Sequence, residues 1–371
     1  MEQIVLIASF LVPLVLSAVI FHNGRGNTSK KILSFCMLNA AAVFIANYYY
    51  FIRNFEIYTF MHSAHVALVL FIYPSLYFYL SHLTGKLNLS KKMLIHLIPG
   101  FLFFILYFFF FDIKFSHTER IEFLNTYRDE LFAKEKFRLI EWILIINIVF
   151  IILQVIYYSA LIFVESHRYN TRIKNEFSNA ENLQIKWLSW FNIALIAVAI
   201  LSVLFYVVNP FSDANNILLI VSMFVMSVFI WLIGIWGNAQ SVIELPCEEA
   251  PESWNDNNYE TLYSKLLNSL VNDKLYLNPD LTLSELSRTI GTNRTYASKA
   301  INAIYKGNFS SFVNAYRVEV AKTLLKENPD LKMKTIAEQS GFGSVLTFER
   351  NFAKYTGTLP GKIKKASHKK R

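Results

Sequence analysis

The chain has 371 residues, of which 54% are hydrophobic and 17% are charged, whereas an ordinary soluble domain is about 25% charged. This composition argues against a purely soluble protein and excludes intrinsic disorder and a collagen-like repeat. The only two cysteines, Cys36 and Cys247, exclude a disulfide-rich scaffold.

Charge is distributed unevenly along the chain. Residues 1–254 hold 17 basic and 17 acidic side chains, whereas residues 255–371 hold 19 and 10. The whole formal net charge of +9 therefore lies after residue 254. A neutral apolar part followed by a basic polar part predicts two regions with different surroundings and different roles.

Seven runs in the first part of the chain contain no Asp, Glu, Lys or Arg. A helix needs about 20 apolar residues to cross the hydrocarbon core of a bilayer, where it satisfies its own backbone hydrogen bonds. Residues 1–236 are therefore predicted to form a seven-helix transmembrane module. The seven runs are residues 3–21, 32–52, 60–80, 93–111, 142–164, 188–208 and 217–236.

The loops between these runs predict the orientation, because Lys and Arg favour the cytoplasmic side. Loops 22–31, 81–92 and 165–187 carry ten Lys and Arg residues, whereas loops 53–59 and 209–216 carry one. The three basic loops are predicted to be cytoplasmic. The N-terminus is then outside, and the region after the seventh run is inside. The first run lacks the basic start and cleavage site of a signal peptide, so we expect it to be a span.

Two features of the apolar module remain open from the sequence. His62 and His65 are three residues apart on one helix face, where they could bind a metal or make hydrogen bonds inside the bundle. Without a third ligand at a suitable spacing, hydrogen bonding is the favoured interpretation, and no cofactor or metal is predicted. Loop 112–141, predicted to be outside, either covers a ligand pocket or forms a solvated helical hairpin.

Residues 237–256 interrupt the apolar pattern with two prolines and five acidic residues. We interpret this stretch as a flexible linker, which as a random coil spans about 25 Å. It separates the membrane module from a third region, residues 257–371.

Helical periodicity resumes after the linker. Thr282 is a predicted N-cap, followed by a helix over 283–290 that ends at Gly291, the type of residue that suits a left-handed turn. Asn293 is the predicted N-cap of a second helix over 294–303. A helix, a turn containing glycine and another helix form the helix-turn-helix pattern.

This pattern occurs twice. Ile336, Ala337 and Gly341 repeat the spacing of Leu286, Ser287 and Gly291 fifty residues later. The second unit continues into a predicted helix over 344–354, and an amphipathic helix over 309–325 is predicted to connect the two units. A repeated helix-turn-helix in a basic region favours two DNA-reading heads on one rigid connector.

Further residues of the connector and of the second unit stand at characteristic spacings: Tyr316, Arg317, Ala321, Leu324, Leu325, Ile336, Ala337, Gly341, Phe342, Phe348, Arg350, Phe352, Gly357 and Pro360. With these residues, the stretch from about 276 to 366 resembles the DNA-binding domain of AraC/XylS-type transcription regulators. Its first unit departs from the family pattern, since Ala297 and Ala300 stand where larger apolar residues are usual. A multi-span module stands in place of the family's usual soluble arm, which resembles the membrane-bound branch of such regulators.

The resemblance also implies which side chains face DNA, because the second helix of each unit enters the major groove. Arg and Lys donate to guanine, and Leu contacts the thymine methyl group. Lys299 and Arg350 could instead contact phosphates or solvent, and Asn293 and Ser344 could act only as caps. Phe348 and Phe352 are predicted to be core residues. The implied DNA-binding residues are Asn293, Arg294, Thr295, Ser298, Lys299, Ser344, Leu346 and Arg350.

Three functions compete at this stage. The favoured one is a membrane-tethered, sequence-specific transcription regulator of the bacterial cytoplasmic membrane. Its expected partners are double-stranded DNA, the lipid bilayer, a second copy of the chain, and a small-molecule or envelope signal. The alternative is a multi-span receptor or transporter with a helical regulatory domain that does not bind DNA. A membrane enzyme is disfavoured, because we find no metal-ligand set, phosphate loop or nucleophile motif.

Overall fold

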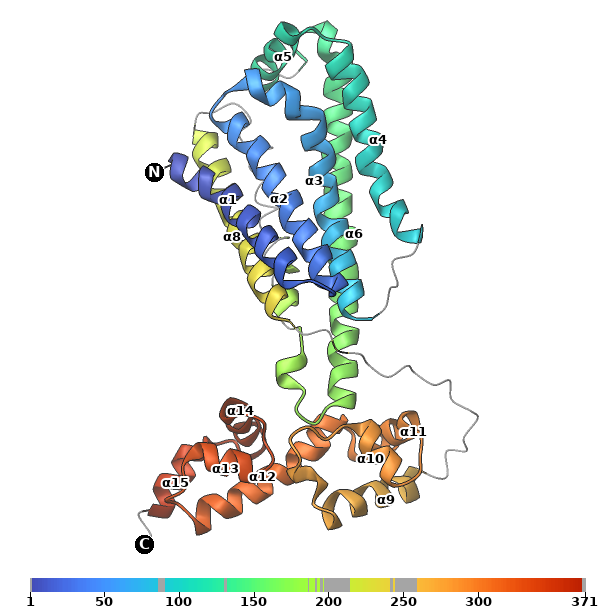
Figure 1. Ribbon diagram of the computed structural model, residues 1–371, viewed down its shortest axis with the longest axis vertical. Helices are drawn as coiled ribbons and strands as arrows, with labels where there is room; N and C mark the ends of the chain where they lie inside the picture. Colours follow the sequence, from blue (N-terminus) through green and yellow to red (C-terminus); the bar gives the residue numbers. More distant parts are fainter. Residues whose placement is uncertain are drawn as a thin grey trace. The chain divides into compact units, whose positions relative to one another are not determined.

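The computed structural model describes residues 2–85, 91–129, 132–185, 187–190, 192–193, 196, 214–240, 243 and 259–368. The chain divides into two compact units. The first unit comprises Met1–His167 and Ile185–Ile243, and the second comprises Arg168–Gln184 and Glu244–Arg371. The described residues are mostly helical, which confirms the predicted all-α class (Figure 1).

Long antiparallel helices make up the first unit, and α2 lies between α1 and α3 (Figure 1). α8 packs against α1 and α2, and α3 packs against α4. The helices of this unit are α1 (Glu2–Asn23), α2 (Thr28–Phe51), α3 (Phe55–Leu83), α4 (Ile98–Tyr107), α5 (His117–Asp129), α6 (Arg138–Glu176) and α8 (Ala214–Ala239).

Five of the seven predicted spans coincide with helices that are long and apolar enough to cross a membrane. These helices cover Gln3–Asn23, Thr28–Phe51, Phe55–Leu83, Leu94–Ile113 and Glu135–Glu176. The predicted seventh span lies within α8, and most of the predicted sixth span and of the linker 237–256 lies outside the described residues. The count of seven spans therefore stays a prediction.

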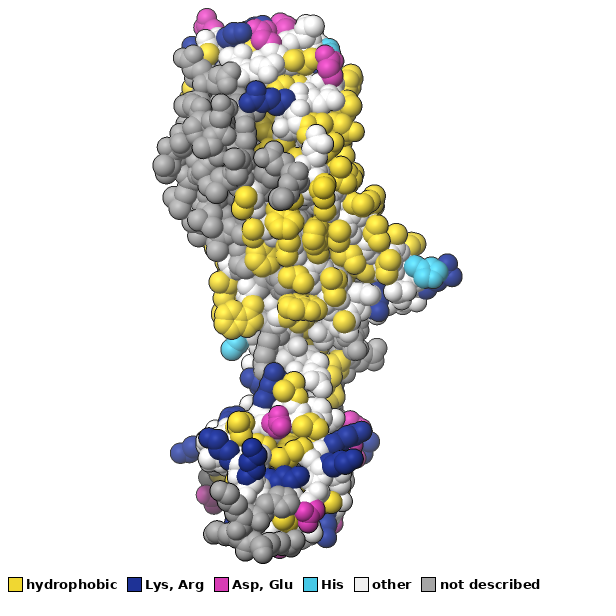
Figure 2. Space-filling model, turned by 90° about the vertical axis from the view of Figure 1, so that its left-hand side faces the viewer, with side chains coloured by type: hydrophobic (Ala, Val, Ile, Leu, Met, Phe, Trp, Pro, Cys, Tyr) yellow, Lys and Arg dark blue, Asp and Glu magenta, His cyan; other side chains and the backbone are white. Residues whose placement is uncertain are grey.

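Apolar side chains cover much of the outer surface of the first unit, as Figure 2 shows for the face in view. Ile4, Phe60 and Ile156 are each more than 60% exposed. In the second unit, large hydrophobic side chains that are exposed among the described residues are few: Val271, Ile304, Leu346 and Leu359. This difference between the two units follows the composition of the two parts of the chain. An apolar outer surface is expected of a unit that contacts lipid.

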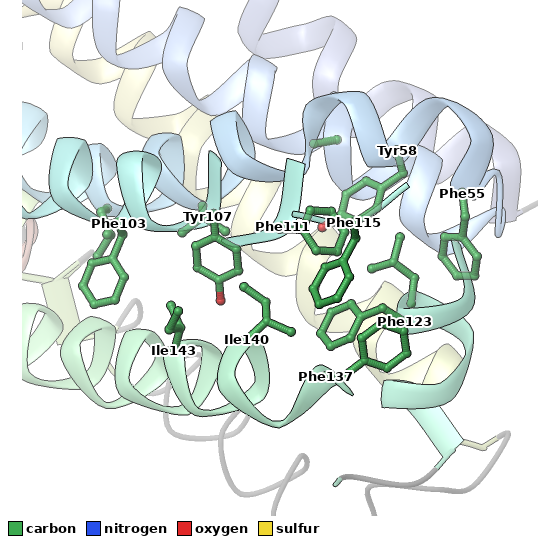
Figure 3. Packing of buried hydrophobic residues seen from close by; sticks show 14 residues of the cluster. Phe55, Tyr58, Phe103, Tyr107, Phe111, Phe115, Phe123, Phe137, Ile140 and Ile143 are labelled. Carbon is green, nitrogen blue, oxygen red and sulfur yellow. The ribbon is translucent and has the colours of Figure 1, made fainter. Parts of the chain in front are cut away.

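The predicted outer loop 112–141 contains a helix, α5, whose apolar side completes an aromatic core (Figure 3). Phe123 from α5 packs edge-to-face against Phe111 and Phe137, with ring centroids 5.5 and 5.3 Å apart. On the polar side, Lys134 and Lys136 pair with Glu122. The described part of the loop thus contains an α-helix, α5, that covers hydrophobic side chains, and a role in covering a ligand stays a prediction.

The polar residues singled out in α3 form hydrogen bonds with a neighbouring tyrosine. The Tyr58 hydroxyl lies 3.2 Å from Nδ1 of His62 and 3.0 Å from Nδ1 of His65. Among the described residues, no group of three or more His, Cys, Asp or Glu side chains is arranged to hold a metal ion.

Helix α6 extends twelve residues beyond the predicted end of the fifth span at residue 164. The apolar run ends there because charged side chains begin, but charged residues are good helix formers and the helix continues to Glu176. Its last residues, from Arg168, belong to the second unit.

The second unit has two hydrophobic cores joined by one helix. The first half of α12 contributes Phe309, Phe312 and Val313 to the first core, and its second half contributes Val318 and Ala321 to the second. The predicted connector over 309–325 is therefore confirmed. The helices of this unit are α9 (Tyr259–Asn272), α10 (Leu283–Thr289), α11 (Arg294–Ala300), α12 (Phe309–Glu327), α13 (Met333–Gln339), α14 (Val345–Thr356) and α15 (Pro360–His368).

Candidate nucleic-acid interface

The first head consists of α10, a turn and α11. The Thr282 hydroxyl accepts a hydrogen bond from the Glu285 backbone N–H at 3.1 Å, and Gly291 adopts the left-handed conformation with φ of +70°. The Asn293 side-chain oxygen then accepts from the Thr295 N–H at 2.6 Å. Both predicted caps and the glycine turn are confirmed, because short polar side chains satisfy the free N–H groups that begin each helix.

Helix α11 places its apolar side chains inward and its polar side chains outward. Ala297 and Ala300 are fully buried, and Lys299 is exposed on the other side. Thr295 and Ser298, half-buried, lie on the same side as Lys299 because residues three and four apart share a helix face. After Ala300 the helix continues as a wider turn over Ile301–Tyr305, which extends it close to the predicted end at residue 303.

The second head consists of α13, a turn and α14. Gly341 has a φ of +84°, and the Ser344 hydroxyl accepts from the Thr347 N–H at 3.1 Å. Phe348 and Phe352 are fully buried, which confirms that they are core residues.

The outer face of α14 carries the two side chains implied to meet base edges. Leu346 is 54% exposed, and the Arg350 side chain is 62% exposed. They are four residues apart and therefore adjacent on the helix surface. An exposed leucine beside an arginine suits a groove that presents both thymine methyl groups and guanine acceptors. Base contact by either residue stays a prediction.

The turn of the second head meets the segment that precedes the first head. A Cβ atom added to Gly341 would lie 2.5 Å from the backbone oxygen of Tyr276 and 2.8 Å from Cα of Leu277, which belong to the segment preceding the first head. Only glycine allows backbones to approach this closely. Gly341 is therefore required twice, for the positive φ of the turn and for the close approach to Tyr276 and Leu277, which we call the junction.

Arg317 of α12 closes the same junction from inside. Its side chain is fully buried and donates to the backbone oxygens of Tyr276 and Asn278, each at 2.7 Å, and to the Ser178 hydroxyl at 2.9 Å. Burial lowers the pKa of its guanidinium to about 10. Because Arg317 also lies over the Phe342 ring, it ties the connector helix to the segment before the first head and to the turn of the second head. In the sequence, Arg317 is one of the residues that carry the family resemblance, and its buried contacts could not be predicted.

Residues 168–184, which come from outside the predicted DNA-binding domain, pack against both heads within the second unit. Glu176 pairs with Arg294 at 3.2 Å, and Glu181 pairs with Arg350 at 3.6 Å. Sequence reasoning missed both contacts. The only local signal is that Glu176 and Glu181 occur in a loop predicted to be cytoplasmic for its Lys and Arg residues.

A comparison with protein-family models matches the region of the two heads. Residues 286–366 match the family model described as a helix-turn-helix domain. An uncharacterized HTH-type transcriptional regulator of Staphylococcus aureus strain MSSA476 is 36% identical over 87 residues, which cover 24% of this chain and 12% of that protein. The uncharacterized HTH-type transcriptional regulator YtdP of Bacillus subtilis strain 168 is 35% identical over 82 residues, which cover 22% and 10% of the two chains.

A solved structure also aligns with part of this chain. It is the C-terminal domain of the two-component response regulator yesN from Fusobacterium nucleatum, with 28% identity, 29% of this chain and 99% of that chain covered, and a TM-score of 0.25. The chain spans about a tenth of the length of the curated relatives it matches.

The repeated turns, the connector helix and the family match define the class of this domain. Residues 286–366 belong to a helix-turn-helix domain of the AraC type, which confirms the resemblance seen in the sequence. The similar curated proteins are HTH-type transcriptional regulators.

Proposed function

We propose that the chain is a membrane-tethered transcription regulator that binds specific promoter DNA and responds to a signal sensed at the membrane or outside it. The proposal assigns DNA binding to residues 257–371 and membrane insertion to residues 1–236, with residues 237–256 as the linker. Its partners are double-stranded DNA, the lipid bilayer, a small-molecule or envelope signal, and a second copy of the chain.

The observation that carries the proposal is the outward face of the second head. Leu346 is one of the few large hydrophobic side chains exposed in the described part of the second unit, and it adjoins the exposed Arg350. On a recognition helix, an exposed leucine can contact a thymine methyl group while the neighbouring arginine donates to guanine. The family match over 286–366 supports the same assignment.

Membrane tethering rests on different observations. Five helices of the first unit are long and apolar enough to cross a bilayer, and their outward side chains include Phe60, Phe101 and Ile156. Burying these side chains in lipid is favourable by roughly 1.5–3 kcal/mol for each one that is fully covered. The basic loops favour a cytoplasmic position for the DNA-binding domain, because Lys and Arg are enriched in cytoplasmic loops.

DNA binding is tested by enrichment of genomic DNA with the full-length chain, followed by affinity measurements on the recovered sites. We expect recovery of promoter regions and steep salt dependence, because neutralised phosphates release counterions. A footprint should cover two segments about 10 base pairs apart, one for each head. Absence of enrichment would favour the receptor or transporter that does not bind DNA.

Orientation is tested separately with reporter fusions. Fusions after Lys31 and Lys91 should report the cytoplasm, and a fusion after Arg128 should report the exterior. A periplasmic reporter signal at Lys91 would contradict the topology and would separate the tethered domain from chromosomal DNA.

A further inference from the structure

We infer that residues 168–184 form an intramolecular clamp that competes with DNA for the arginines of both heads. The inference rests on the proposed DNA-binding function and names how that binding is regulated. In the clamped state the DNA-reading face is partly occupied by the chain's own carboxylates. Release of the clamp frees Arg294 and Arg350 together.

Glu176 occupies the first head. Its side chain is 2% exposed, accepts from Nη1 of Arg294 at 3.2 Å, and accepts from the backbone N–H of Ser284 at 3.2 Å. Carboxylates and phosphates each offer two oxygen acceptors to a guanidinium. Glu176 therefore occupies a donor of Arg294 that a DNA phosphate would use.

Glu181 occupies the second head. One of its oxygens lies 3.6 Å from Nη1 of Arg350, and the other accepts from the Asn351 side chain at 3.1 Å. Asn179 packs at the start of α14, where a Cβ added to Gly343 would meet its side-chain nitrogen at 2.0 Å. The clamp thus contacts the start of the second recognition helix and its residues Arg350 and Asn351, while Leu346 stays exposed. In a helix-turn-helix the N-terminal part of this helix enters the major groove.

The backbone of the clamp is anchored at the junction between the heads, which lets one short segment reach both. The Ser178 N–H donates to the Leu281 oxygen at 3.0 Å, and its carbonyl accepts from the Ser310 hydroxyl at 3.0 Å. Its hydroxyl accepts from the buried Arg317 at 2.9 Å. Phe177 forms an isolated antiparallel bridge with Thr282.

The position of the clamp in the chain gives it a means of control. It is the end of α6 together with the segment that follows, and both the preceding residues and those from Ile185 belong to the first unit. The apolar unit therefore has a covalent connection to the DNA-reading face besides the linker 237–256. A signal that binds two conformations of the first unit unequally shifts the clamp equilibrium through this connection.

The first experiment removes the charges that hold the arginines. Full-length protein in lipid nanodiscs carries E176Q together with E181Q, and the control carries E319Q together with E338Q. The control removes two carboxylates that pair with Lys322 and Lys334 on the same unit, so the net charge changes equally. We expect the clamp variant to bind a selected promoter site at least fivefold more tightly than the control, the lower end of common coupling strengths.

Equal dissociation constants for the two variants would overturn the inference and would make residues 168–184 a structural support. Thermal unfolding of both variants identifies a loss of fold. If the clamp variant does not fold, the test passes to a second variant that keeps both glutamates.

The second variant locks the clamp with a reversible cross-link, N179C with G343C, in a background with C36A and C247S. The Asn179 Cγ lies 3.1 Å from a Cβ built on Gly343, close to the roughly 3 Å that separates a cysteine sulfur from the partner Cβ across a disulfide. Oxidation should lower DNA affinity at least fivefold, and reduction should restore it. Undiminished binding by the oxidised, cross-linked chain would overturn the inference.

The two experiments separate this inference from the proposed function. Equal DNA binding by clamped and released forms refutes the clamp and leaves the regulator intact. Absence of specific DNA binding in every form, including the reduced chain, refutes the regulator and the clamp with it.

Discussion

The first and second heads follow one sequence pattern fifty residues apart, yet their surroundings differ. The first recognition helix, α11, has 7 residues before it widens, whereas α14 has 12. A Cβ atom added to Gly291 would meet nothing within 4 Å, whereas one added to Gly341 would lie 2.5 Å from the backbone oxygen of Tyr276. The same local sequence signals therefore form the same turn in both heads. The segments packed around each turn determine whether its glycine is also needed for close backbone packing.

The charged side chains of the two heads differ in the same way. Arg294 is 18% exposed and pairs with the buried Glu176, whereas Arg350 is 62% exposed and pairs loosely with Glu181. An ion pair with a buried partner holds its geometry more firmly than an exposed pair. The second head is thus the more accessible one for DNA, and the first is held more tightly by the clamp.

The largest expected difference between the heads concerns their glycines. We expect Gly341→Ala to destabilise the second unit by about 3 kcal/mol or more, since positive φ strain adds to a clash with the backbone. Gly291→Ala should cost about 1 kcal/mol, because its Cβ meets nothing within 4 Å and only the φ strain remains. The free energy of unfolding of each variant is measured by urea titration, with hydrogen exchange of the α12 amides as the probe. Equal costs would mean that the junction at Tyr276 yields without strain.

The second difference concerns DNA affinity. Arg350→Ala should weaken binding to a selected site by about 1–3 kcal/mol if the guanidinium contacts a base. Lys299→Ala should cost less, because α11 is the shorter recognition helix and an ammonium does not make the bidentate contact of a guanidinium. Competition titrations with selected and random duplexes measure both. A loss that is equal on the two duplexes would make the residue a phosphate contact.

The smallest expected effect concerns the caps. Asn293→Ala and Ser344→Ala should each destabilise the second unit by about 1 kcal/mol, because each leaves a helix N–H without its side-chain acceptor. Replacement by Asp keeps the acceptor and serves as the control for folding. A Ser344→Ala variant that loses DNA affinity beyond its loss of stability would show that Ser344 also contacts a phosphate.

Much of the second unit could be predicted from sequence because its signals are local. Thr282, Asn293 and Ser344 cap the helices that they precede, and Gly291 and Gly341 have the positive φ that their turns require. Each of these signals acts within four residues. The eight implied DNA-contacting residues were all placed on the two turns and recognition helices, although their contacts with DNA stay predictions.

The residues at the junction and in the clamp could not be predicted in this way. Glu176 and Arg294 are 118 residues apart, and Ser178 and Arg317 are 139 apart. Neither periodicity nor capping carries information over such separations. The helical extension of α6 beyond residue 164 was also missed, since charged side chains end an apolar run without ending a helix.

The sequence by itself determined the all-helical class, the apolar module, the repeated turns and the helices between them, because hydropathy, caps and glycine conformations act over a few neighbouring residues. Only the tertiary structure decided which backbone Gly341 meets, why Arg317 is buried, and that Glu176 and Glu181 reach the arginines of both heads. Those contacts depend on packing between distant segments, where close approach and pairing of charges are settled in three dimensions.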